Sequence, residues 1–162
     1  MLSAILSKES CAKCKFCCSF RRKSLWETPV FDSATVERLK NLYPDVKFRQ
    51  VGKSSFTYDI SGNYKTQDSE EEALCPFLDP SKGCKLPAEL KPFDCSIWPL
   101  RAVKMPDGKI KTALTPTCPA INKLPKEDVS AFVKKELDKR IIDYAEKNPD
   151  IIKDYSDFFV VL

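Results

Sequence analysis

The 162-residue sequence contains no histidine and only four glycines. Without an imidazole there is no Ser-His or Cys-His catalytic pair, no histidine general base, and no zinc site of two cysteines and two histidines. The few glycines form no glycine-rich loop of the kind that cradles a nucleotide phosphate. The sequence therefore offers no identifiable catalytic acid, base or nucleophile, and it does not decide whether the protein is an enzyme.

Long apolar runs are also missing. No segment approaches the roughly 20 apolar residues of a membrane-spanning helix, so we expect no membrane partner. The apolar start, residues 1–7, has no basic segment before it and ends at Lys8 and Glu9, unlike an export signal. Because disulfides normally require export to an oxidising compartment, the sequence predicts a cytoplasmic protein whose thiols stay reduced.

A strong excess of one charge is absent as well. Lysine and arginine total 27 and aspartate and glutamate 23, so the net charge of +4 is too small to indicate a nucleic-acid partner. Five basic residues nevertheless surround the first cysteines, namely Lys13, Lys15, Arg21, Arg22 and Lys23. Such a patch could bind RNA or an acidic protein, but compensation of thiolate charge on a solvated face is the favoured interpretation.

The sequence does have enough apolar material for a core. Hydrophobic residues make up 43% of the chain and ten of them are phenylalanine, in a length typical of one domain. No repeat, low-complexity segment or linker interrupts residues 1–162. The pattern predicts a single small α+β domain with irregular cysteine-bearing loops around metal sites, a β-hairpin and a C-terminal helix.

Local signals define elements in the first half of the chain. A helix is predicted from Asp32 or Ser33 to just before Pro44. Its inward-facing residues are expected to be Val36, Leu39 and either Leu42 or Tyr43. Segments 47–51 and 55–60 have the composition of strands, and 68–72 is an acidic, exposed loop.

In the second half, segments 98–104 and 109–115 flank Pro106-Asp107-Gly108, which predicts a hairpin. The clearest helix is predicted over 125–147, with Pro125 in its first turn. Its apolar residues follow the helical spacing: Val129, Phe132, Val133, Leu137, Ile141, Tyr144 and Ala145. The apolar end, 158–162, is expected to dock on the core, with a partner-binding tail as the alternative.

The main chemical feature is a set of eight cysteines: Cys11, Cys14, Cys17, Cys18, Cys75, Cys84, Cys95 and Cys118. In a reducing compartment, clustered cysteines more often bind metal than form disulfides or fill a core. The first three follow one another at steps of three, a spacing that suits a tetrahedral zinc ion or the first ligands of an iron–sulfur cluster. A ferredoxin run ends with a Cys-Pro pair, and here Cys75-Pro76 and Cys118-Pro119 are two such pairs, although the remaining spacings do not fit.

The vicinal pair Cys17-Cys18 is unusual. Neighbouring side chains diverge in extended or helical backbone, so one of the two is expected to reach a different centre, or a different edge of the same centre. Eight cysteines suffice for two four-sulfur centres, either zinc or an oxidised iron–sulfur cluster, each carrying a charge of about −2. Two such centres would offset the net charge of +4, but the spacing does not fix how the cysteines divide between them.

Several patterns occur in a fixed order: Cys11-Ala-Lys-Cys14-Lys-Phe-Cys17-Cys18, Cys75-Pro-Phe-Leu-Asp79, Gly83-Cys84, and Lys91-Pro-Phe-Asp-Cys95 followed by Trp98-Pro99. This order resembles the CxxCxxCC cysteine-cluster family (YkgJ-like), which is described as a zinc- or iron-chelating domain. The resemblance covers residues 11–118, about two thirds of the chain. It implies that all eight cysteines are metal ligands.

The resemblance leaves the reaction open. Members of the family are often labelled Fe–S oxidoreductases, and the family is related to a flagellin lysine methylase. The alternatives to plain metal binding are therefore an iron–sulfur oxidoreductase or electron-transfer protein, and an accessory protein that binds a protein partner. The chain departs from the family at Lys91, where an arginine is usual, so a planar fork of donors is lost.

Residues next to the predicted ligands have two interpretations each. Asp79 and Asp94 are expected to be turn or loop carboxylates rather than contacts of a metal-bound water. Phe77, Phe93 and Trp98 are expected to pack in the core, and they could also exclude water from a metal. Gly83 is expected to adopt a positive φ and turn the loop that carries Cys84.

Overall fold

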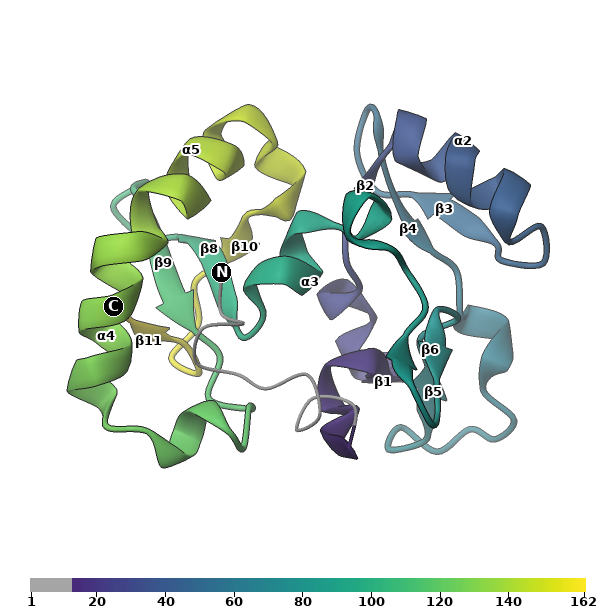
Figure 1. The fold of residues 1–162 in the computed structure, drawn as a ribbon, viewed down its shortest axis with the longest axis horizontal. Coiled ribbons are helices and arrows are strands. Elements are labelled where there is room, and N and C mark those ends of the chain that lie inside the picture. Colours follow the sequence, from purple (N-terminus) through teal and green to yellow (C-terminus); the bar gives the residue numbers. More distant parts are fainter. Residues whose placement is uncertain (1–12) are drawn as a thin grey trace. The chain divides into compact units, whose positions relative to one another are not determined.

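The structure, a computed structural model, describes residues 13–162. Cys11, the first predicted metal ligand, lies outside the described residues. Contacts between Cα atoms divide the chain into two compact units, with the boundary between Cys95 and Ser96. Both units contain helices and short strands (Figure 1), which confirms the predicted α+β class. The extent of a single domain over 1–162 stays a prediction.

Small antiparallel sheets build the first unit. Strand β1 (Ser19–Arg21) pairs with β5 (Glu72–Leu74), and β6 (Leu78–Asp79) pairs with β7 (Gly83–Cys84). Strand β4 (Ser55–Tyr58) lies between β2 (Phe31–Asp32) and β3 (Phe48–Gln50), so the predicted strands at 47–51 and 55–60 are confirmed in slightly shorter form. The 3-10 turns of this unit are η2 (Phe16–Cys18), η3 (Arg22–Glu27), η4 (Ser61–Asn63) and η5 (Ala88–Leu90).

Helix α2 (Ser33–Leu42) begins where it was expected. The Asp32 carboxylate accepts a hydrogen bond from the Thr35 backbone N–H at 2.8 Å, as an N-cap residue does. Leu39 is completely buried, whereas Leu42 is 60% exposed. Tyr43 packs against the core, so Tyr43 rather than Leu42 continues the inward-facing side.

Aromatic rings fill the core of the first unit. Phe77 is only 1% exposed and makes edge-to-face contacts with Phe31, Tyr43 and Tyr58, at ring-centroid distances of 5.3–6.2 Å. Rings in this geometry attract one another beyond the burial of their area. The expected core role of Phe77 is therefore confirmed, and the segment that follows Cys75 is anchored by it.

The second unit contains one four-stranded sheet. Strands β8 (Leu100–Lys104) and β9 (Ile110–Leu114) form the predicted hairpin, and Gly108 in its turn has φ 83°. Strand β10 (Lys153–Asp154) runs parallel to β8, and β11 (Val160–Val161) runs antiparallel to β9. The expected docking of 158–162 on the core is thus confirmed, because β11 joins the sheet and Phe159 is buried beside Val103.

The predicted helix at 125–147 is not continuous. It forms α4 (Lys126–Glu136) and α5 (Asp138–Lys147), with a break at Leu137 (φ −127°, ψ −32°), and Pro125 precedes the first turn instead of lying in it. Its buried residues recur every four positions, at Val129, Val133, Leu137, Ile141 and Ala145. A turn takes only 3.6 residues, so this row drifts around a straight helix, and a break at its middle member lets both halves bury their apolar side.

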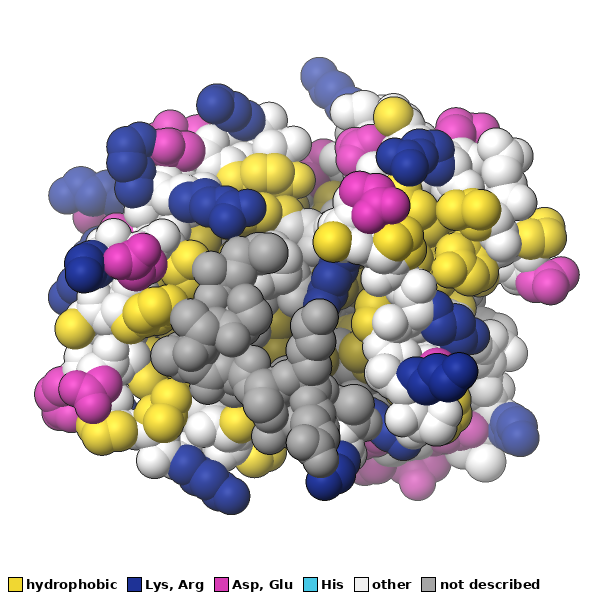
Figure 2. All heavy atoms as spheres, in the orientation of Figure 1, with side chains coloured by type: hydrophobic (Ala, Val, Ile, Leu, Met, Phe, Trp, Pro, Cys, Tyr) yellow, Lys and Arg dark blue, Asp and Glu magenta, His cyan; other side chains and the backbone are white. Residues whose placement is uncertain are grey.

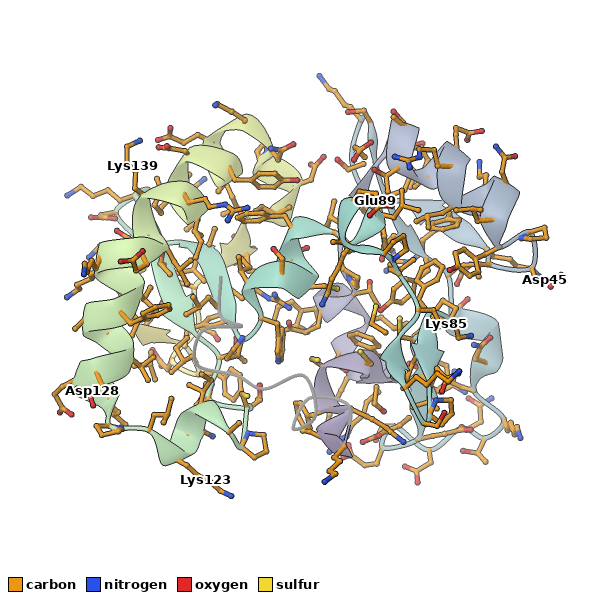
Figure 3. The ribbon with its side chains drawn as sticks, in the orientation of Figure 1. Asp45, Lys85, Glu89, Lys123, Asp128 and Lys139 are labelled. Atoms are coloured by element: carbon orange, nitrogen blue, oxygen red, sulfur yellow. The ribbon has the colours of Figure 1, made fainter. Side chains whose placement is uncertain are left out.

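Two further features complete the second unit. Helix α5 packs against β8 and β9, and the 3-10 turns η6 (Ile121–Lys123) and η7 (Pro149–Ile151) lie before α4 and after α5. Asp128, labelled in Figure 3, lies with Glu127 in the first turn of α4, where carboxylates complement the helix dipole. No helix within residues 13–162 combines the length and the apolar character that a bilayer crossing requires.

Candidate metal centre

A tight turn presents the vicinal cysteines. Lys15 has a left-handed backbone (φ 56°), and its carbonyl accepts a hydrogen bond from the Cys18 backbone N–H at 2.9 Å. The turn η2 (Phe16–Cys18) ends at Cys18, and the next residue, Ser19, has an extended backbone. In this geometry the Cys18 thiol donates a hydrogen bond to the Cys17 sulfur. The two thiols are therefore in contact within the single 3-10 turn η2, whereas neighbouring side chains were expected to diverge. That the pair serves two centres, or two edges of one centre, stays a prediction.

Strand pairing brings Cys75 to Cys18. The ladder of β1 and β5 pairs Ser19 with Leu74, and one step further the Cys75 backbone N–H donates to the Cys18 carbonyl at 2.8 Å. Residues opposite one another on neighbouring strands have their Cβ atoms about 5 Å apart. Two cysteines 57 positions apart in the sequence are thus held side by side by main-chain hydrogen bonds.

The β6–β7 hairpin carries Cys75 and Cys84 at its base. The Leu78 backbone N–H donates to the Cys75 carbonyl at 3.0 Å, and Leu78 pairs with Cys84 across the ladder. Gly83 has φ 87°, as predicted for the residue that turns this loop. The hairpin therefore holds both cysteine backbones in a defined register.

Hydrogen bonds to the Cys75 sulfur come from two sides. The backbone N–H of Phe77 and the hydroxyl of Tyr58 both donate to it. Burial raises the pKa of the Cys75 thiol to about 11, and nearby Cys84 and Cys17 add to this, while the two hydrogen bonds act in the opposite direction. The donors favour the charged thiolate, which is the form that binds a metal.

Cys95 lies in the first turns of α3 (Phe93–Ile97), the helix that contains the boundary between the units. Burial raises the pKa of its thiol well above the usual value, and the charges of Asp94, Cys75 and Cys17 raise it further. Lys91 acts in the opposite direction. The basic charge at the position where the resemblance predicts arginine is therefore close enough to favour the Cys95 thiolate.

These contacts define a thiol cluster, which consists of Cys17, Cys18, Cys75, Cys84 and Cys95. The hydrogen bond with Cys17 is the main cause that raises the pKa of Cys18, followed by burial and by the charges of Cys17, Cys75 and Cys95. Each thiol thus disfavours ionisation of its neighbours. A bound cation would remove this penalty, and binding it would release protons.

The structure does not bring all eight predicted ligands together. Cys14 is exposed at the start of the described residues, and Cys118 belongs to the second unit. Within residues 13–162, no group of three or more cysteine, aspartate or glutamate side chains is close enough to hold a metal ion. The chemistry of the donors fits a thiophilic metal, but the sulfurs of the thiol cluster would have to approach one another further to bind it.

Both carboxylates that flank the cysteines have structural roles. Asp79 accepts hydrogen bonds from the Ser81 N–H at 2.8 Å, the Ser81 hydroxyl at 2.6 Å and the Lys82 N–H at 2.9 Å, and these lower its pKa to about 2. The buried Asp94 accepts from the Val30 backbone N–H at 3.0 Å, which ties α3 to the segment before β2. The expected turn role is confirmed for Asp79.

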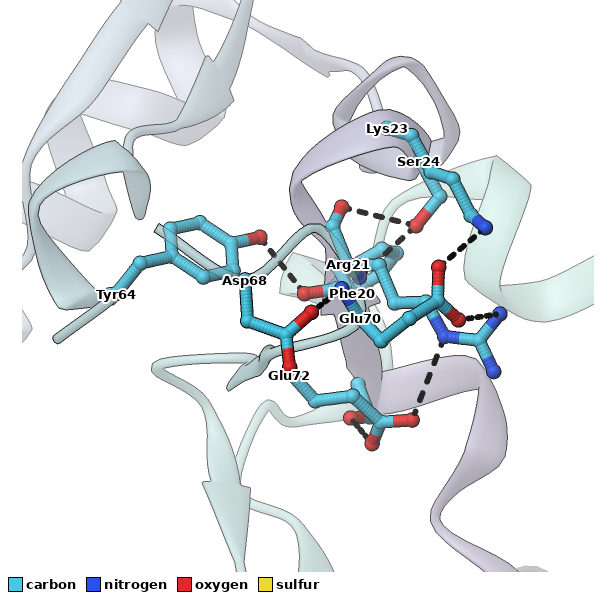
Figure 4. A network of polar contacts seen from close by, with 9 residues as sticks. Phe20, Arg21, Lys23, Ser24, Tyr64, Asp68, Glu70 and Glu72 are labelled. Carbon is cyan, nitrogen blue, oxygen red and sulfur yellow. Dashed lines mark hydrogen bonds and ion pairs between the residues drawn. The ribbon is translucent and has the colours of Figure 1, made fainter. Parts of the chain in front are cut away.

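Arg21 and Lys23 in the basic patch are neutralised by carboxylates rather than by thiolates. Arg21 and Lys23 form ion pairs with Glu70, at 3.2 Å and 2.5 Å, and Arg21 also approaches Glu72 (Figure 4). Arg22 donates to the Thr66 carbonyl, and its guanidinium stacks on Tyr64. On the face shown in Figure 2, basic and acidic side chains are interspersed. The acidic segment 68–72 therefore supplies carboxylate partners for Arg21 and Lys23, and compensation of thiolate charge by the patch stays a prediction.

Tyr58 is the residue near the cysteines that sequence reasoning missed. It lies in β4, within the long segment that contains no cysteine, and it is 1% exposed. Burial raises the pKa of its hydroxyl well above the usual value, and the charges of Cys75 and Cys95 raise it further. The sequence predicted a strand over 55–60, but nothing local in it connects Tyr58 to Cys75.

Comparison of the chain with family models, curated proteins and solved structures gave no match. The resemblance to the CxxCxxCC cysteine-cluster family therefore stays a prediction that rests on the order and spacing of the cysteines.

Proposed function

We propose that this chain is a metal-binding protein that holds zinc or iron through its cysteines. The observation that supports the proposal is the thiol cluster, in which four separate segments deliver Cys17, Cys18, Cys75, Cys84 and Cys95 to one region of the first unit. Thiolates are the ligands that zinc and iron–sulfur clusters take from proteins. The chemistry of these sulfur ligands therefore supports binding of zinc or iron.

The partial exposure of the cysteines favours a role as metal ligands over a role as inert core residues. Unpaired cysteines that only fill a core are among the most buried residues in proteins. Here Cys14 and Cys84 are exposed, and the other five described cysteines keep some exposed surface as whole residues although burial raises the pKa of Cys18, Cys75 and Cys95. Partly accessible thiols that gather from distant segments are better explained by an ion that reaches them from solvent.

We propose two four-sulfur centres, because eight cysteines at four per centre make two. The thiol cluster would supply ligands to at least one of them, and Cys11, Cys14 and Cys118 would complete the sets. We propose binding rather than catalysis, since the carboxylates of Asp79 and Asp94 already accept hydrogen bonds from backbone N–H groups. An iron–sulfur protein that transfers electrons is the alternative.

A cytoplasmic location goes with this proposal. All seven described cysteines are free thiols. Thiols persist in this form where the cell keeps them reduced. Metal ions are the partners that the proposal requires, and the interspersed charges of Figure 2 give no support to a nucleic-acid partner.

The test is a comparison of metal content between cysteine variants. Cys75→Ser and Cys84→Ser remove sulfurs of the thiol cluster, and we expect each to lose the zinc or iron of the centre to which that cysteine belongs. Asp107→Asn is the control, because Asp107 lies in the exposed turn of the β8–β9 hairpin and should leave the metal content unchanged. Equal metal content in all three variants and the wild-type protein would contradict the proposal.

A further inference from the structure

A short antiparallel ladder holds two cysteines opposite one another. Strands β1 and β5 pair Ser19 with Leu74. Cys18 directly precedes β1 and Cys75 directly follows β5, so the next step of the same register sets Cys18 opposite Cys75. The Cys75 backbone N–H donates to the Cys18 carbonyl at 2.8 Å, and the pairing therefore continues to this step.

The spacing of this pair suits a disulfide. Opposite residues that are joined by main-chain hydrogen bonds have Cα atoms about 5.5 Å apart. Disulfides span Cα distances of about 4.4–6.8 Å, and most often about 5.5–6 Å. Side chains two positions apart on a ladder share a face, and Phe20 and Ala73, the pair two steps further on, are both buried. Cys75 packs against the core that contains them.

Other pairs of described cysteines are less suited. Cys17 and Cys18 are neighbours, and Cα atoms across a trans peptide bond are only about 3.8 Å apart, which is below the disulfide range. Cys84 lies opposite Leu78, three residues beyond Cys75. Among the cysteines of residues 13–162, Cys18 and Cys75 are therefore the two that a ladder sets opposite one another.

We infer that Cys18 and Cys75 form a reversible disulfide that locks β1 to β5 when the protein meets a peroxide. Both cysteines keep part of their surface exposed, so a small oxidant reaches them. In a reducing compartment such a bond is usually transient and serves as a redox sensor. The bond withdraws two sulfurs from metal, so oxidation opposes the proposed metal binding, but the inference itself needs no bound metal.

Hydrogen peroxide supplies the oxidising equivalents. One thiolate attacks a peroxide oxygen, the O–O bond breaks, and the sulfur becomes a sulfenic acid while the released hydroxide takes up a proton and leaves as water. The second thiolate attacks that sulfur, forms the S–S bond and displaces the oxygen, which leaves as a second water. Two thiols thus give two electrons and two protons to one peroxide.

The test treats the folded, reduced protein with a small excess of hydrogen peroxide, with a chelator present so that no metal ion shields the thiols. Remaining thiols are alkylated, and linked peptides are identified by mass spectrometry after proteolysis. We expect most linked material to join Cys18 to Cys75, and two of the eight thiols to escape alkylation until dithiothreitol is added. A different dominant link, such as Cys75 to Cys95, or no link at Cys18, would overturn the inference.

The same reaction in concentrated urea shows whether the fold directs the pairing. Short loops close more readily in an unfolded chain, so the four cysteines of residues 11–18 should then pair among themselves. A predominant link between Cys18 and Cys75 in urea as well would contradict the role of the ladder. Because this mapping uses the wild-type protein, it does not depend on whether a variant folds.

Thermal unfolding gives a second readout. The link closes a loop between residues 57 positions apart, so oxidation should raise the Tm of the first unit by about 8 °C or more, and dithiothreitol should reverse the shift. Cys17→Ser is the matched control, because it removes the neighbouring thiol of the same turn and should keep the shift. Cys18→Ser should abolish it. Equal shifts in the two variants would overturn the inference, while the proposed function would stand.

Discussion

Leucines three positions apart on α2 should respond very differently to truncation. Leu39 has no exposed surface, whereas Leu42 is 60% exposed. Leu39→Ala removes a fully buried side chain and leaves a cavity, and such changes typically cost about 2–5 kcal/mol. Leu42→Ala removes atoms that already face solvent, and substitutions of this kind usually stay within about 0.5 kcal/mol.

Urea unfolding of the metal-free, reduced protein measures the difference. The chain has two tryptophans, so in a Trp98→Phe background the fluorescence of Trp26 reports on the first unit alone. We expect Leu39→Ala to lower the urea concentration at the midpoint of unfolding strongly. For a unit as small as the first one, it should also lower Tm by about 8 °C or more. Comparable losses for Leu39→Ala and Leu42→Ala would refute the assignment of the buried face of α2, and with it the packing that supports the cysteines.

Two further predictions concern the backbone and pH. Gly108→Ala should destabilise the protein by about 1–2 kcal/mol, because a backbone with φ 83° strains any residue that has a Cβ, even though no atom lies within 4 Å of the added carbon. Gly62 is equally open but has no positive φ, so Gly62→Ala should be neutral or stabilise the protein by about 0.4–1 kcal/mol. Thermal unfolding that gave both substitutions the same sign would contradict this. Asp79 has a folded pKa of about 2 against an ordinary value of 3.8, so its hydrogen bonds stabilise the protein above pH 4 and are lost as the pH falls toward 2. The loss of stability caused by Asp79→Asn should therefore be present at pH 6 and shrink between pH 4 and pH 2, and a loss that is independent of pH would speak against the turn role.

The sequence predicted those elements whose cause is local. An N-cap side chain at Asp32, a turn at Gly108 and alternating apolar residues act within a few positions of themselves, so α2, the β8–β9 hairpin and the strands β3 and β4 were anticipated. The break at Leu137 was not, because it depends on what each half packs against, and α5 packs on β8 and β9. Apolar spacing alone does not show where such a row becomes too long for a straight helix.

In the candidate site, too, local features were predicted from the sequence and contacts between distant segments were not. Spacing identified the cysteines, but the pairing of Cys18 with Cys75 depends on which strand lies beside β1. The ion pairs of Arg21 and Lys23 with Glu70 depend on where the acidic segment folds, so the same patch was attributed to thiolates. Tyr58 was missed because its link to Cys75 is formed only in three dimensions.

The most direct test of the central claim is the metal and sulfide content of the protein, purified without oxygen and without a metal-affinity column. Metal binding by the cysteines predicts either about two zinc ions per chain and a colourless protein, or iron with matching sulfide and a coloured one. Chelation should then release the metal and expose the thiols. Protein that carries neither metal, with all eight thiols reactive from the outset, would contradict the claim.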